Sequence, residues 1–90
     1  MTLNDVIFVD NLPKIDLHGY DRVSARIKIN DFIKENYVLK QNVFAIIHGV
    51  GSGIIMKETH ETLRKNKLVR DFKTYYYNNG CTIVEIIVDK

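Results

Sequence analysis

The 90-residue chain has little of three features that would place it in particular protein classes: cysteine, proline and long apolar runs. Its one cysteine, Cys81, cannot form a disulfide within the chain, which suits a reducing compartment, and we expect this side chain to be buried. No apolar run has the length of a membrane span, and the N-terminal residues lack the pattern of a signal peptide. We therefore expect a cytoplasmic protein that does not contact a membrane.

The chain also lacks a charge of one sign. It has 13 basic and 11 acidic side chains and a net charge of +2, so composition alone does not indicate nucleic-acid binding. A site for a polyanion must instead come from where the charges are placed. The length suits one domain over residues 1–90, with a core from residues 14–88 and residues 1–13 as an N-terminal arm or an edge strand at Val6 to Val9.

Two strands are predicted in the first half of the chain. After Pro13, which suits a strand entrance, Ile15 and Leu17 alternate with polar residues, and we expect this strand to end at Gly19. Residues 43–47 are almost continuously apolar, which is typical of a central strand covered on both faces.

Two helices and a hairpin complete the pattern. Asp21 is a plausible N-cap for a helix that runs to about Val38, with one buried face formed by Ala25, Ile29, Phe32, Ile33 and Tyr37, and with Ile27 off that face. A second helix is predicted from Ile54 to about Asn66, with a thin buried stripe of Ile55, Thr59, Thr62 and Leu63 between charged residues that include Glu58. Residues 68–77 and 81–88 predict a hairpin with its turn at residues 78–80. The order βαβαββ predicts an α/β fold, a two-layer sandwich with a mixed sheet.

The first polar motif is Asp16-Leu17-His18-Gly19, at the carboxyl end of a predicted strand. Ligands collect at such ends in open α/β sheets. Asp16 and His18 are two residues apart and project to the same side of a strand, where a carboxylate can orient an imidazole for proton transfer. The alternative is that Asp16 caps the next helix or binds backbone amides.

The second motif is His48-Gly49-Val50-Gly51-Ser52-Gly53, which opens the second helix. Glycines allow a tight turn and close approach to a ligand, and the free amides of a helix N-terminus attract anions. We predict a phosphate site at Gly49, Gly51, Ser52 and Gly53, with Lys57 adding a charge. The spacing matches neither a Walker loop nor a dinucleotide fingerprint, and a plain tight turn is the alternative. His48 is open to three interpretations: a base, a phosphate contact or a structural histidine.

Other polar and aromatic residues give weaker signals. We expect His60, in the second helix, to be exposed and without a direct role. Tyr75, Tyr76 and Tyr77 are candidates for stacking on bases, although packing of at least one against the sheet is the stronger expectation. No Cys/His spacing indicates a structural zinc site.

Taken in order, the two motifs and the later run Gly80-Cys81-Thr82-Ile83-Val84-Glu85 resemble the Smr (small MutS-related) domain family from about Lys14 to Ile87. The resemblance implies a compact sandwich similar to the C-terminal domain of a bacterial translation initiation factor, nucleic-acid binding and, in many members, endonuclease activity on DNA or RNA. Members with the Asp-x-His form, present here as Asp16 and His18, are the ones linked to cleavage. The chain departs from the family pattern at Val50, where a basic residue is common, and at Thr59, where an apolar residue is usual.

The hypothesis that follows is a phosphodiesterase of the endonuclease type, in DNA repair or recombination or in ribosome-linked RNA quality control. His18 would act as general base or acid, oriented by Asp16, and His48 as a second proton-transfer group or phosphate donor. Attack by the 2′-hydroxyl of RNA needs no metal, whereas attack by water on DNA would use Mg²⁺ or Mn²⁺ held by Asp16. The alternatives are a non-catalytic module that binds nucleic acid or the ribosome, and a small-molecule phosphate binder. A ribosome or a MutS-like protein is a further candidate partner.

Overall fold

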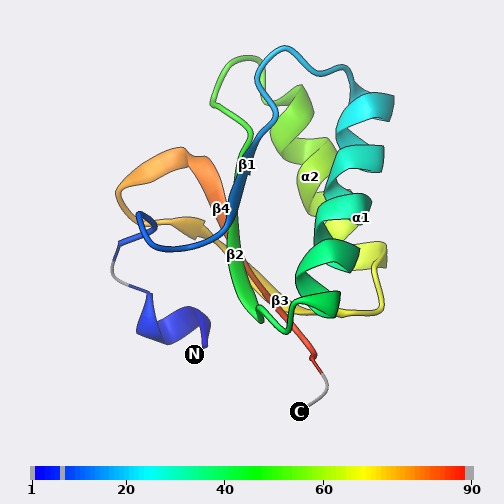
Figure 1. Cartoon of the computed structure of the whole chain (residues 1–90). Coiled ribbons are helices and arrows are strands. Elements are labelled where there is room, and N and C mark those ends of the chain that lie inside the picture. The colour runs from blue at the N-terminus through cyan, green and yellow to red at the C-terminus, as the bar shows by residue number, and fades with distance from the viewer. Residues whose placement is uncertain (1, 7, 89–90) are drawn as a thin grey trace.

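The computed structural model describes residues 2–6 and 8–88 and has the predicted order of elements. A short 3-10 helix precedes four strands and two α-helices: η1 (Leu3–Asp5), β1 (Lys14–Asp16), α1 (Arg22–Val38), β2 (Val43–Ile47), α2 (Ile54–Lys65), β3 (Val69–Tyr75) and β4 (Asn78–Ile86). Figure 1 shows both α-helices on one face of the sheet. The predicted α/β fold with βαβαββ order is confirmed.

The sheet is mixed, with strand order β1-β2-β4-β3. β1 and β2 are parallel, whereas β4 is antiparallel to both β2 and β3. β3 therefore runs in the direction of β2. As a result, the carboxyl ends of β1, β2 and β3 all lie at the same end of the sheet, which is where ligands bind in folds of this kind.

The main core lies between the sheet and the two helices. Ile29 and Ile33 of α1 are fully buried against Phe44 and Ile46 of β2, together with Leu63 of α2. Four of the five residues predicted for the buried face of α1 are buried, and Tyr37 is partly buried. Ile27 is 55% exposed, which shows that the predicted stripe faces the sheet.

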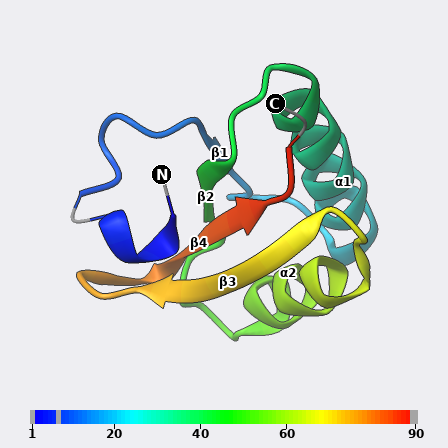
Figure 2. The ribbon, with the colours of Figure 1, turned by 90° about the horizontal axis from the view of Figure 1, so that it is seen from below.

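The N-terminal segment covers the opposite face of the sheet, and Figure 2 shows it on the side away from the helices. Leu3 is buried there, and its N–H donates to Oε1 of Glu85 on β4 at 2.9 Å. Residues 2–6 and 8–13 contain no strand, so of the two alternatives for this segment, arm and edge strand at Val6 to Val9, the described residues form the arm; Ile7 lies outside them. Cys81 is buried on this face, as predicted, and burial raises the pKa of its thiol.

The first strand is shorter than predicted. β1 ends at Asp16, and the chain then turns through His18 and Gly19, where φ is +81°. The turn forms because the Asp16 carboxylate accepts a hydrogen bond from the His18 backbone N–H at 2.9 Å.

The hairpin turn is displaced from its predicted position. Tyr76 and Tyr77 form the turn, Tyr75 pairs with Asn78, and residues 78–80 belong to β4. Gly80 is needed inside the strand, because a Cβ at this position would lie 3.0 Å from the Cα of Gly49. The Gly80 carbonyl accepts hydrogen bonds from the backbone N–H groups of His48 and Gly49, at 2.8 and 2.9 Å. A glycine that signals a turn in the sequence thus serves close backbone contact instead.

We predict that Gly80→Ala lowers the free energy of unfolding by about 1–3 kcal/mol, because the added methyl group forces the Gly49 backbone away. Urea denaturation of the variant against wild type measures this loss. Asn79→Ala, at the exposed neighbouring position in β4, is the control and should change stability little. An unchanged urea midpoint for Gly80→Ala would show that the two backbones do not depend on this close approach.

Candidate functional site

The two polar motifs meet at one end of the sheet. Asp16 is the register partner of Ile47, and the Leu17 N–H donates to the Ile47 carbonyl at 2.8 Å. Figure 1 shows the loop after β1 beside the loop between β2 and α2. The predicted meeting of the two motifs requires β1 and β2 to be neighbours, and they are.

The first loop exposes the His18 side chain. The Asp16 carboxylate is exposed and binds the His18 backbone, which is the contact named as the alternative for this residue. Among residues 2–6 and 8–88, the His18 ring has no hydrogen-bond partner, so it is available to a ligand. Asp21, and not Asp16, caps α1 by accepting from the Ser24 N–H at 2.7 Å, and this bond lowers the pKa of Asp21.

The second loop is exposed and shaped by glycine. Gly49 and Gly53 have φ values of +78° and +82°, a region that residues with a side chain rarely adopt. Gly53 is the N-cap of α2 and supplies no side-chain cap, so amides of the first turn are open to an anion. The Ser52 hydroxyl lies 3.5 Å from the N–H of Ile54, and Val50 is 62% exposed. These features leave the predicted phosphate site open at the surface.

The side chain of His48, by contrast, points into the protein. Side chains alternate between the faces of a strand, so Ile47 lies on the arm side with its partner Asp16, and His48 lies on the helix side. His48 is 8% exposed, and both ring nitrogens are engaged: Nδ1 lies 2.8 Å from the Gly49 carbonyl and Nε2 lies 2.8 Å from Oγ1 of Thr82. The structure brings the backbones of the two motifs together but not the Asp16 carboxylate and the His48 ring.

A third histidine joins this buried arrangement. Nε2 of His60 lies 3.0 Å from Oγ1 of Thr82, and the His60 ring packs on Phe72, with 5.2 Å between the ring centres. The expectation that His60 is exposed is wrong: it is half-buried between α2 and the sheet. One feature of the sequence indicates this position of His60. Side chains alternate along β4, so Thr82 lies on the same face as Val84 and Ile86, toward α2, where it needs a polar partner.

The donors in this chain of hydrogen bonds follow from the Gly49 carbonyl, which can only accept. Nδ1 of His48 must therefore carry a proton, and its Nε2, in the neutral ring, accepts from the Thr82 hydroxyl. The Thr82 oxygen then accepts from Nε2–H of His60. The Thr82 hydroxyl thus connects the two rings in one chain of hydrogen bonds. It ties α2 to β4 and to the first residue of the glycine loop.

The surroundings of His60 disfavour its charged form. Burial is the main cause that lowers the pKa of His60, and repulsion from His48, when that ring is protonated, and from Arg64 acts in the same direction.

Two basic residues lie beside the glycine loop. Arg22 of α1 and Lys57 of α2 line one hollow of about 210 Å³, together with Ile54, Glu58 and Glu61. Arg22 was not singled out from the sequence, although its place in the first turn after the Asp-Leu-His-Gly motif is a signal that it lies at this end of the sheet. Its side chain is 69% exposed, so it can reach a ligand.

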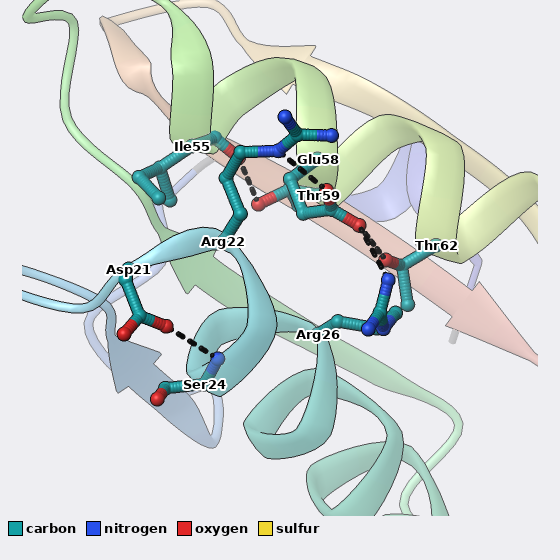
Figure 3. A network of polar contacts seen from close by, with 8 residues as sticks. All are labelled: Asp21, Arg22, Ser24, Arg26, Ile55, Glu58, Thr59 and Thr62. Atoms are coloured by element: carbon teal, nitrogen blue, oxygen red, sulfur yellow. Dashed lines mark hydrogen bonds and ion pairs between the residues drawn. The ribbon is translucent and has the colours of Figure 1, made fainter.

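Figure 3 shows how Arg22 is held. Its Nε lies 3.3 Å from Oε1 of Glu58, and the Thr62 hydroxyl donates to Oε2 of the same carboxylate at 3.3 Å. Glu58 is buried, contrary to its expected place among the charged residues around the stripe, and these two contacts satisfy its carboxylate there. Thr59 is also fully buried, and its hydroxyl donates to the Ile55 carbonyl at 2.7 Å, which accounts for a polar residue at this core position.

A metal site of several side chains is not seen. Residues 2–6 and 8–88 contain no group of three or more His, Cys, Asp or Glu side chains placed to hold a metal ion. In the same part of the chain, no helix is long and apolar enough to cross a membrane.

Sequence comparisons identify related proteins. A model of the Smr domain family matches residues 15–87. The protein named Endonuclease MutS2 from Alkaliphilus metalliredigens is 31% identical over 80 residues, which cover 86% of this chain and 10% of that protein. Its counterpart from Aquifex aeolicus is 33% identical over 73 residues, with 81% and 10% covered. The chain spans about a tenth of the curated relatives it matches.

Solved structures share the fold. The Smr domain of Thermus thermophilus MutS2 superposes with a TM-score of 0.82 and 24% identity, over 84% of this chain and 99% of that one. YdaL, a stand-alone small MutS-related protein from Escherichia coli, gives 0.69 and 17% identity, over 81% of this chain and 63% of that one. These similarities confirm the architecture.

We predict that acid lowers the stability of the chain through His60. The pKa of His60 is lowered in the folded state, so the unfolded chain binds the proton more readily. The contribution of neutral His60 to the free energy of unfolding is fully present above the ordinary histidine pKa near 6.5. This contribution is lost as the pH falls through the lowered pKa of the folded state. Urea midpoints between pH 7.5 and 5.5 measure the loss, which should be smaller in His60→Gln. His18→Gln, at an exposed histidine, is the control and should retain it. An equal loss in wild type and His60→Gln would contradict the prediction.

Proposed function

This chain belongs to the Smr domain family, and from that premise we propose that it is an endonuclease that binds nucleic acid and cleaves phosphodiester bonds. One observation carries the proposal: an exposed histidine, His18, stands on a turn held by Asp16, beside an open glycine loop at a helix N-terminus. The name of the relatives, Endonuclease MutS2, supports the same reaction.

The glycine loop and its basic neighbours are proposed to hold the scissile phosphate. The open amides at the start of α2 favour an anion, and hydrogen-bond donors fixed before the reaction stabilise the charge that develops on the phosphate. Arg22 and Lys57 line the hollow at the start of α2, where Glu58, which is paired with Arg22, and Glu61 also lie. The two cations and two carboxylates balance, so the preference for an anion comes from the open amides and from Arg22 and Lys57 turning toward the phosphate. Many family members have a basic residue at the position of Val50. In this chain, Arg22 and Lys57 are proposed to supply that positive charge instead.

His18 is proposed to transfer the proton. An imidazole near neutral pH can accept a proton from the attacking hydroxyl, and its protonated form can give one to the leaving oxygen. Asp16 acts through the backbone, because its carboxylate holds the turn that presents His18. In this role Asp16 is a positioning residue.

The residues suit RNA better than DNA. On RNA, His18 removes the proton of the neighbouring 2′-hydroxyl, and the 2′-oxygen attacks the phosphorus. The bond from phosphorus to the 5′-oxygen breaks, the protonated His18 returns the proton to that oxygen, and a 2′,3′-cyclic phosphate remains. On DNA, water must attack, which commonly requires a divalent cation held by carboxylates. Asp16 is the single carboxylate of the motif, and its Oδ1 already accepts the His18 N–H, so the donor set does not match a dedicated Mg²⁺ or Mn²⁺ site. No step is therefore assigned to a metal.

His48 receives a structural role in this proposal. Both of its ring nitrogens are used inside the protein, and one of them binds the carbonyl of Gly49. His48 therefore supports the proposed phosphate loop from the protein interior, and no proton transfer is assigned to it.

The second candidate function is a non-catalytic module that binds nucleic acid or the ribosome. The contact between Asp16 and the His18 backbone favours it, because the same bond would form if Asp16 had only a structural task. The near-neutral total charge is also consistent with a protein that relies on a partner, such as a ribosome or a MutS-like protein, for affinity.

We predict that His18→Ala reduces cleavage of end-labelled RNA by about 10²- to 10⁴-fold, the usual contribution of a general acid or base, and leaves binding within about twofold. Cleavage of RNA and of supercoiled DNA is measured with Mg²⁺, with Mn²⁺ and with chelator. Asp16→Asn should reduce cleavage as well, whereas Asp31→Asn, an exposed aspartate on α1, is the matched control and should not.

Three outcomes separate the candidates. RNA cleavage that persists in His18→Ala would exclude the proposed role of His18. Retarded RNA without cleavage by wild type would favour the binding module. Competition by mononucleotides as effective as that by oligonucleotides would indicate a small-molecule phosphate binder.

We also predict that Lys57→Ala weakens binding of oligonucleotides and lowers the dependence of log Kd on log salt by about one unit, because one phosphate contact is lost. Arg22→Ala should act in the same direction. Fluorescence anisotropy at several salt concentrations measures both effects. Lys34→Ala, near the other end of α1, is the control; an equal change in this variant would show that the effect comes from total charge and not from the hollow.

A further inference from the structure

Three exposed aromatic rings, two from the β3–β4 hairpin and one from the N-terminal arm, lie together at the tip of the hairpin. Tyr76 and Tyr77 are 87% and 65% exposed, and Phe8 of the N-terminal arm is 66% exposed. Phe8 and Tyr77 stack with 6.0 Å between ring centres and 18° between ring planes, and Tyr76 stands at 85° to Tyr77 at 5.0 Å. Segments almost 70 residues apart in the sequence thus form one aromatic surface.

Folding does not account for tyrosine at these positions. Neither Tyr76 nor Tyr77 has a positive φ, so the backbone of this turn accepts most residue types and does not require tyrosine. The contact of Gly80 with Gly49 fixes the register and leaves Tyr76 and Tyr77 at the turn. Their rings remain in solvent, where a large apolar group gains little stability. Large aromatic rings that are left in solvent side by side, where the backbone does not require them, indicate an interaction site.

The aromatic surface lies on the same face and at the same end of the sheet as Asp16. Tyr75 packs on the arm side, which is also the side of Ile47, the register partner of Asp16. β3 is separated from β1 by three strand spacings, which gives roughly 15 Å across the sheet. A flexible chain that contacts His18 can therefore also reach the hairpin tip.

A hollow beside the rings has the size and chemistry for a base. Its volume is about 380 Å³, within the range of small-ligand pockets, and it is lined by Val6, Lys73, Thr74, Tyr75, Tyr76, Tyr77 and Ile83. Lys73 supplies a positive charge for a phosphate, and the tyrosine rings supply faces for stacking. The combination of a cation with aromatic rings is that of surfaces that bind single strands.

We propose that Tyr76 and Tyr77, with Phe8 and Lys73, form a stacking site for unpaired bases, so that the substrate is a single-stranded segment which crosses from the His18 loop to the hairpin tip. This inference rests on the proposed function. Bases in a duplex are stacked on one another and do not offer free faces, so the site selects unpaired nucleotides.

The test compares binding of a fluorescein-labelled 15-nucleotide 2′-O-methyl oligouridylate with that of a duplex of equal length. The 2′-O-methyl group prevents attack by the 2′-oxygen, so binding is measured without cleavage. The variant Tyr76→Ala with Tyr77→Ala should bind the single strand at least about fivefold more weakly, and the duplex within twofold of wild type. Because the chain has five tyrosines and no tryptophan, quenching of tyrosine fluorescence by the oligonucleotide gives a second readout, which the variant should reduce.

Two control variants separate stacking from loss of apolar surface. Tyr76→Phe with Tyr77→Phe keeps the rings and should retain single-strand affinity. Val38→Ala with Leu39→Ala removes two residues that are 70% and 61% exposed, at the end of α1, and should have no effect. Thermal unfolding confirms that each variant folds.

The outcomes distinguish this inference from the proposed function. Unchanged single-strand affinity in the alanine variant, or an equal loss for the duplex, would overturn the stacking site while wild-type cleavage remains. Wild type that binds neither probe would overturn both.

Discussion

The close approach of Gly49 and Gly80 is the constraint on which the rest of this end of the molecule depends. The Gly80 carbonyl accepts two backbone hydrogen bonds from the start of the glycine loop, and a side chain at Gly80 would collide with Gly49. This contact joins the loop after β2 to the first residues of β4. It determines where the glycine loop begins, fixes the register of the hairpin, and leaves Tyr76 and Tyr77 at its tip.

A second set of contacts holds the same loop from the helix side. His60 of α2, Thr82 of β4 and His48 form one chain of hydrogen bonds that ends at the Gly49 carbonyl. Buried polar groups are costly without partners, and here each member has one, so the chain fixes a single arrangement of rings. The histidine that precedes the glycines thereby shapes the loop, whereas His18 is exposed, and our proposal assigns the proton transfer to it.

A net charge of +2 gives the chain little general attraction for a polyanion, so the placement of the charges at the site matters. Glu58 is buried between the helices and holds Arg22 at the mouth of the hollow that Lys57 also lines. In our proposal, a small domain with this little basic surface gains affinity from a preformed anion site and from stacking on aromatic rings. Both contributions are short-ranged, so both depend on the precise folding of the loops at one end of the sheet.

The sequence by itself determined the order of elements, the buried face of α1 and the two polar motifs, because periodicity, the Asp21 cap and the run at residues 43–47 are local signals. It also placed the two motifs at one sheet end through the rule for parallel strands. Only the tertiary structure decided that residues 78–80 lie in a strand, that His60 is half-buried and that His48 faces away from Asp16. These features depend on strand register and on contacts between distant segments, and a one-residue shift in register reverses the face on which every side chain lies.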